Sequence, residues 1–104
     1  MVKVNVKHKE NKVISLTMKG HADFAEEGQD LVCAGASSIV VGMMNALGEM
    51  APETCDFLMK KGHVEILVKK VCDHNQILLE ALIYQLKTLQ ETYSQYITII
   101  EQEV

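Results

Sequence analysis

Two residues that could act as a nucleophile and its base lie close together in the sequence. His21 follows a glycine directly, and Cys33 comes twelve positions later. A thiolate is a strong nucleophile, and an imidazole within hydrogen-bonding reach can take the proton of the thiol. The residues between them are long enough to fold back as a loop and bring the two side chains together. We therefore treat Cys33 as a candidate nucleophile and His21 as its candidate base.

A helix predicted to begin at Asp30 would place Cys33 in its first turn. Asp30 can cap this helix, which continues to Met50 through apolar residues at helical spacing. The unpaired amides and the positive end of the helix dipole in a first turn favour an anion such as a thiolate. The backbone N–H groups of Cys33 and Ala34 are then candidate donors to an oxyanion.

Other residues of this stretch can support the pair. Asp30 can alternatively hold His21 as the carboxylate of a triad does, although capping is the favoured role. Ser37 lies one helical turn after Cys33, so its hydroxyl can orient the histidine or a substrate carbonyl. Gly20 and Gly28 bracket the intervening acidic loop and are its candidate hinges.

A structural role for the same residues stays open. A cysteine with apolar neighbours is often a small core residue, and a histidine at the end of a strand is often a surface residue. Cys55 and Cys72 lie in or beside predicted strands without a helix N-terminus, which favours inert packing. A redox sensor would need one of them near Cys33. A metal site formed by Cys33, His21 and another histidine is an alternative, but the histidines and cysteines lack the dense spacing of such a site, so we expect no metal.

The composition describes a small acidic globular chain. Its 104 residues are 48% hydrophobic and 23% charged, with a formal net charge of -4, which favours one domain over residues 1–104. A net negative charge argues against a protein that binds nucleic acid through its phosphates. Polar residues interrupt the apolar run 34–50, so we expect no membrane segment. The N-terminus lacks the apolar core of a signal peptide, which predicts a cytoplasmic protein.

The periodicity predicts an α+β fold of order ββαββαβ, with two main helices packed on a largely antiparallel sheet. The expected strands cover residues 2–6, 14–18, 54–59, 63–69 and 96–100, and the expected helices cover 30–50 and 73–93. Small residues on the first helix, Gly35, Gly42 and Ala46, allow close approach of its own sheet or of a second subunit.

The motif residues resemble those of a known family, the bacterial ribosomal-processing cysteine protease Prp, and the likeness covers essentially the full chain. They are Gly20-His21-Ala22, Gly28, Asp30, Val32-Cys33-Ala34 and Ser37. The resemblance implies a homodimeric thiol protease, a hydrolase without metal or cofactor. It also implies that Cys33 is the nucleophile and His21 the base. The implied reaction, a step of ribosome biogenesis, removes the N-terminal extension of large-subunit ribosomal protein number twenty-seven.

The substrate extension in that family ends in aromatic residues followed by alanine, which would require an apolar groove. Phe24, Val32, Met43 and Met44 are the candidates for lining it. The alternative function is a noncatalytic, ribosome-associated interaction protein in which the first helix docks a partner and Cys33 is merely packed.

Overall fold

The computed structural model describes the backbone of residues 1–20 and 27–104, and the side chains of residues 1–20 and 31–104. The elements follow the predicted ββαββαβ order. They are β1 (Val2–Lys9), β2 (Lys12–Lys19), α1 (Glu27–Met50), β3 (Cys55–Lys60), β4 (His63–Val68), α2 (Asp73–Thr92) and β5 (Ile97–Glu103). The predicted α+β class is confirmed.

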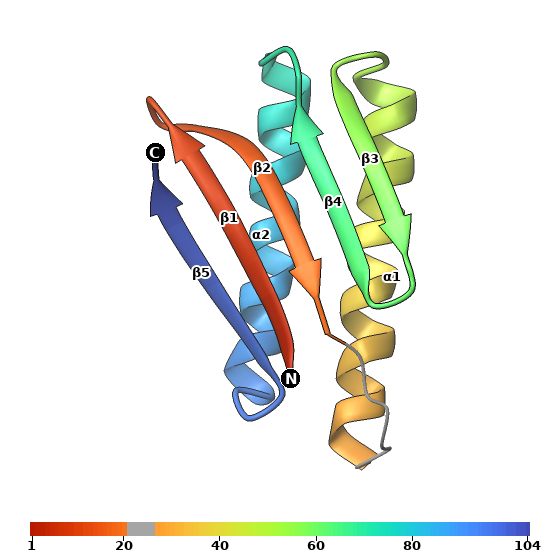
Figure 1. Ribbon diagram of the computed structural model, residues 1–104. Coiled ribbons are helices and arrows are strands. Elements are labelled where there is room, and N and C mark those ends of the chain that lie inside the picture. The colour runs from red at the N-terminus through yellow and green to blue at the C-terminus, as the bar shows by residue number, and fades with distance from the viewer. Residues whose placement is uncertain (21–26) are drawn as a thin grey trace.

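The five strands form one sheet in the order β3-β4-β2-β1-β5. Only β1 and β5 are parallel neighbours, and the other pairs are antiparallel. Both helices lie on the same face of this sheet, with α1 behind β3 and β4 and α2 behind the middle of the sheet (Figure 1). The helices form one layer and the sheet the other, so side chains of α1 can lie next to the ends of the strands that it covers.

Residues with positive φ angles close the two hairpins. Glu10 and Asn11, between β1 and β2, have φ angles of 51° and 64°. Gly62, between β3 and β4, has a φ angle of 72°, as its place in a polar turn predicted. Glycine is suited to this conformation because it has no Cβ to clash with the neighbouring carbonyl.

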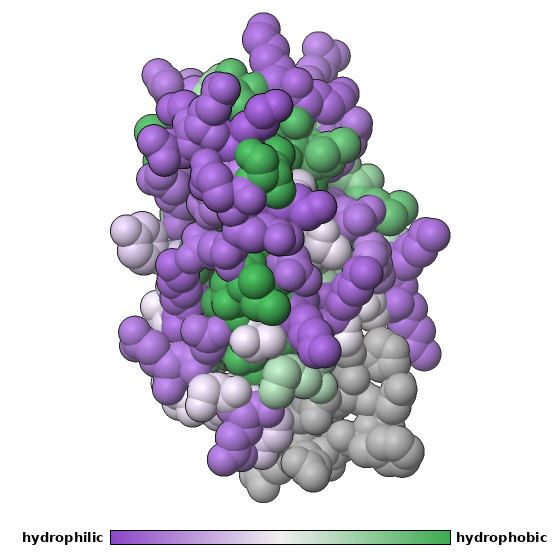
Figure 2. All heavy atoms as spheres, turned by 60° about the vertical axis from the view of Figure 1, so that its left-hand side comes forward, coloured by the Kyte–Doolittle hydropathy of each residue, from purple (hydrophilic) through white to green (hydrophobic). Residues whose placement is uncertain are grey.

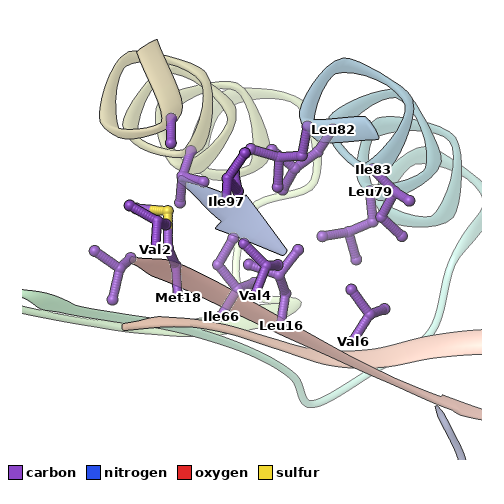
Figure 3. Close-up of a cluster of buried hydrophobic side chains, with 14 of the residues drawn as sticks. Val2, Val4, Val6, Leu16, Met18, Ile66, Leu79, Leu82, Ile83 and Ile97 are labelled. Carbon is purple, nitrogen blue, oxygen red and sulfur yellow. The ribbon is translucent and has the colours of Figure 1, made fainter. Parts of the chain in front are cut away.

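The core lies between the sheet and the two helices. Alternate residues of β1, Val2, Val4 and Val6, are buried, whereas the side chains between them are more exposed. Figure 3 shows these valines pointing toward the helices together with Leu16. The alternation that predicted a half-buried strand thus also determines which face the helices cover.

Helix α2 is fixed at its N-terminus by side chains of its first turn. Cys72 is the N-cap residue, and its amide donates to Asn75 Oδ1 at 3.2 Å. Asn75 in turn donates to the carbonyl of Lys70 at 2.8 Å. The expectation that Cys72 lies away from a helix N-terminus is therefore wrong, because the helix begins directly after it.

Helix α1 begins at Glu27, three residues before the predicted start at Asp30. Its buried stripe includes Val32, Val40 and Leu47, which are fully inaccessible to solvent. By length and composition, Leu31–Met50 also qualifies as a membrane-spanning segment, contrary to our expectation, yet here it packs as a core helix. Four residues of this helix are buried, and Ile39, Met43 and Met44 pack partly buried against the same core, so most of its large apolar side chains contact the core.

Candidate active site

Cys33 lies at a pocket of about 190 Å³ between α1 and one end of the sheet. In Figure 1 this is the lower end, where β2 stops, β1 starts and the β3–β4 turn lies next to α1. The pocket is lined by Val2, Met18, Gly20, Cys33, Ala36, Ser37, Val41, Met59, Lys60, Gly62, His63 and Val64. A larger hollow of about 380 Å³, between Ile39 and the last turns of α2, is lined by neither cysteine nor histidine. Of these two hollows, the first is therefore the one bordered by a cysteine.

Two of the predicted site residues, Cys33 and Ser37, lie together on the side of the pocket that α1 forms. Cys33 is half-buried and Ser37 is exposed, one turn further along the same helix face. Ala36 between them is fully buried and holds this turn against the core. Both polar groups therefore open into the same hollow, while their catalytic roles stay predictions.

Gly20 forms the sheet side of the pocket, opposite α1. Its amide donates a 3.0 Å hydrogen bond to the carbonyl of Gly62, and its φ angle is 107°. A Cβ atom at Gly20 would collide with the backbone carbonyl of Met1. Two independent constraints therefore require glycine here, and they fix the chain directly before His21. His21 itself lies outside the described residues, so its role as base stays a prediction.

The early start of α1 changes four expectations. Asp30 is the fourth residue of the helix, so it is not the N-cap, and Gly28 belongs to the first turn instead of the end of a loop. Cys33 lies in the second turn, where a regular helix pairs the amides of Cys33 and Ala34 with carbonyls four residues earlier. These amides are therefore not free oxyanion donors in this form of α1. The dipole contribution also weakens, since it is confined to the first turn.

The two other cysteines lie together at the opposite end of the sheet from Cys33. The carbonyl of Thr54, next to Cys55, accepts from the amides of Lys69 and Lys70 at 2.8 and 3.2 Å. This brings Cys55 near Cys72. Burial raises the pKa of the Cys55 thiol, and the hydroxyl of Thr54 opposes this only in part. Cys55 is thus less ionised near neutral pH than a free thiol.

The pocket beside Cys33 is not lined by Val32, Met43 or Met44, and which residues line the expected substrate groove stays a prediction. Val32 is fully buried, and Met43 and Met44 pack against the core without lining the pocket. Phe24 lies outside the described residues. The apolar lining instead comes from the strand ends and from Val41, which sequence spacing could not identify because the sheet order brings these strands together. Among the described residues, no group of three or more His, Cys, Asp or Glu side chains could hold a metal ion.

Comparisons with known proteins agree in family and in fold. A family model described as cysteine protease Prp matches residues 1–98. The ribosomal processing cysteine protease Prp of Bacillus subtilis is 34% identical over 101 residues, covering 89% of this chain and 90% of that protein. The Staphylococcus aureus protease Prp in complex with a substrate peptide has a TM-score of 0.87 and 30% identity, covering 98% and 100% of the two chains. Its complex with a covalently linked product peptide has a TM-score of 0.87, 34% identity and the same coverage.

Proposed function

The chain belongs to the cysteine protease Prp family, and we propose that it is a site-specific endopeptidase that removes the N-terminal extension of large-subunit ribosomal protein number twenty-seven. The observation that carries the proposal is Cys33 at an apolar pocket beside Gly20, the residue before His21. We further propose that the reaction takes place in the cytoplasm, where ribosomes are assembled.

In the proposed reaction, His21 takes the proton of Cys33, and the sulfur forms a bond to the carbonyl carbon of the cleaved peptide bond. The resulting tetrahedral intermediate collapses, the C–N bond breaks, and His21 gives its proton to the departing amine. A thioester then joins Cys33 to the extension peptide. Water, deprotonated by His21, hydrolyses the thioester and restores the thiol.

In the proposed reaction, the thiolate of Cys33 is stabilised mainly by the imidazole of His21. Because Cys33 lies in the second turn of α1, the helix dipole contributes less than it would in a first turn. Ser37, on the same pocket, can donate a hydrogen bond to the substrate carbonyl or orient His21. Asp30 lies inside α1 and so cannot be its N-cap. We propose that it supports His21, which is the other role considered for it.

We also propose that the enzyme is a homodimer that uses the outer face of α1. Gly42 and Gly48 lie on this helix, and a Cβ on either would meet nothing within 4 Å. Glycine inside a helix costs about 1 kcal/mol relative to alanine, and close approach of a second helix can offset that cost. Figure 2 shows the molecule from the β5 side, where the face is mostly hydrophilic and its hydrophobic patches are separate from one another.

The test is incubation of the purified protein with a synthetic peptide that spans the N-terminal extension and cleavage site of that ribosomal protein from the same organism. The wild type should cut the peptide at one bond, and Cys33→Ala should be inactive with an unchanged melting temperature. Cys55→Ala is the matched control, because it removes a half-buried thiol far from the pocket. Cleavage by Cys33→Ala at the wild-type rate would contradict the proposal, and binding without cleavage by the wild type would favour a noncatalytic interaction protein.

A further inference from the structure

The lysines and the acidic residues are concentrated in different layers of the molecule. Strands β1 and β2 carry five lysines and no acidic residue. Helix α1 carries three acidic residues and no lysine, and α2 carries three acidic residues and one lysine. The net charge of -4 therefore averages a basic part of the sheet with an acidic helix layer. A net negative charge thus does not exclude phosphate binding at the sheet, because local charge determines the potential there.

Four basic residues form a row across the outer face of the sheet, which is the face turned away from the helices. Lys3 of β1 lies opposite Lys19 of β2 in the strand register. His63 of β4 lies opposite both Lys19 and Lys60 of β3. Lys3 is exposed and its two neighbours on β1 are buried, and directly paired residues share a face, so all four point away from the core. This cationic row crosses the lower end of the sheet in Figure 1, which views the outer face.

The cationic row brings like charges together at a cost to the sheet. Neighbouring strands lie about 4.8 Å apart, so the row spans about 14 Å. Like charges directly opposite each other, as at Lys3 and Lys19, destabilise a sheet. Among the described residues, the carboxylate within ion-pair distance of the row is that of Glu65, which lies 3.5 Å from His63. A row of this kind has no structural benefit, and it suits a partner that carries several negative charges.

The chemistry of the outer face favours phosphates over unpaired bases or a peptide. Lysine is a compact charge on a flexible stem and binds phosphate as a point charge. Phe57 is the one aromatic residue in the five strands, and it pairs with the buried Ile66, so it lies on the inner face. Unpaired bases therefore have no ring to stack on at the row. The row crosses strands whose backbones are already paired, so it offers no sheet edge for adding a peptide strand.

We propose, building on the ribosomal substrate suggested above, that the cationic row binds the phosphates of double-helical RNA beside the active site. Lys60 and His63 also border the pocket of Cys33, and Lys19 directly precedes Gly20 in the pocket wall. RNA held by the row therefore lies next to the place where the peptide is cut. The row thereby directs the enzyme to a ribosomal protein that is already associated with RNA. Recognition is independent of base sequence, because only phosphates are contacted.

Fluorescence anisotropy with a labelled RNA duplex of about 16 base pairs tests the row. Between about 50 and 200 mM KCl, the logarithm of the association constant of the wild type should fall with the logarithm of the salt concentration. The slope should be about -3, one unit for each lysine of the row. Lys3→Gln combined with Lys19→Gln should weaken binding at the lower salt at least about 10-fold and reduce the slope to about -1.

Lys70→Gln combined with Lys87→Gln is the matched control, because it removes the same charge away from the row, after β4 and on α2. It should weaken duplex binding less than about 3-fold. Equal weakening by the two double variants would show that only net charge matters and would overturn the inference, as would a wild type that does not bind the duplex at the lower salt. An oligoglutamate peptide that binds as tightly as the duplex would identify an acidic protein segment as the partner and overturn the assignment to RNA.

Cleavage of the isolated extension peptide separates this inference from the proposed function. Lys3→Gln combined with Lys19→Gln should cut that peptide within about 2-fold of the wild-type kcat/KM, because neither lysine lines the pocket. It should also be at least as stable as the wild type, since a like-charge pair is removed. Loss of peptide cleavage by this variant would assign the lysines to the peptide site and overturn the inference. If the wild type binds the duplex through the row but cuts no peptide, the proposed function fails and the assignment of the row stands.

Discussion

The amide of Gly20 donates to the carbonyl of Gly62 across 3.0 Å, which joins the end of β2 to the β3–β4 turn. Both glycines have positive φ angles and both border the pocket of Cys33. The contact fixes the point at which the chain leaves the sheet toward His21. The pocket wall and the approach to the proposed base are therefore one connected structure.

Gly20→Ala should destabilise the protein by more than about 2 kcal/mol, because the new Cβ both clashes with the Met1 carbonyl and disfavours the φ angle of 107°. Urea denaturation measures the loss. Lys19→Ala, at the exposed end of the same strand, is the control and should change stability by less than about 0.5 kcal/mol. Equal stability of the two variants would mean that the clash is relieved by a small backbone shift.

The thiols of Cys33 and Cys55 should react with iodoacetamide at different rates. Burial raises the pKa of Cys55 above its ordinary value of 9.0, so its alkylation at pH 7 should be slow and should accelerate as the pH rises past that value. Cys33, if paired with His21, should react at least about ten times faster at pH 7. Peptide mass spectrometry assigns each rate. Rates for Cys33 and Cys55 that are equal would argue against an activated nucleophile.

Gln76→Leu should cost about 2–4 kcal/mol of folding free energy. The buried Gln76 amide accepts from the Val13 amide at 2.7 Å and donates to the Val13 carbonyl at 2.9 Å. Leucine would leave both backbone groups buried without a partner. The exposed Gln85, whose amide contacts only its own helix at 3.4 Å, gives the control Gln85→Leu. Similar chemical denaturation midpoints for the two variants would contradict the prediction.

The Glu101 carboxylate should make stability depend on pH in the acid range. Its pKa lies below the ordinary value of 4.5, mainly because Lys87 Nζ donates to it at 2.7 Å and also because His8 lies at 3.0 Å. A lowered folded-state pKa stabilises the protein above pH 4.5, and this contribution is lost as the pH falls through the folded-state value.

Glu101→Gln should therefore reduce stability by about 0.5 kcal/mol at pH 6, a small value because the side chain is 34% exposed. The difference from the wild type should disappear toward pH 3. Glu103→Gln, exposed on the same strand, is the control. A deficit of Glu101→Gln that persists unchanged at pH 3 would exclude the charge as its cause.

Gly42→Ala tests whether the outer face of α1 is exposed to solvent or packs against a second subunit. In a monomer, alanine should stabilise the helix by about 1 kcal/mol, since its Cβ meets nothing within 4 Å. If a second subunit packs closely there, the same Cβ should weaken the dimer. Sedimentation velocity across a concentration series measures this effect. A protein that is monomeric at all concentrations, with Gly42→Ala only more stable, would contradict the proposed interface.

The sequence alone determined the order of the elements, because each is encoded in a local pattern. Alternating valines in β1 predicted a half-buried strand, and Gly62 in a polar turn predicted a positive φ angle. The spacing of Cys33 and Ser37 likewise predicted a shared helix face. Such patterns depend on residues within a few positions of one another, where the periods of helix and strand apply directly.

Tertiary structure alone decided where α1 begins and what surrounds Cys33. Asp30 matches the sequence of a cap, yet the helix starts three residues earlier, at Glu27. The pocket wall combines Met59 and Val64 of the β3–β4 hairpin with Met18 of β2, which α1 separates from that hairpin in the sequence. Only the sheet order β3-β4-β2 places them together, and strand pairing depends on contacts between distant residues that no local period records.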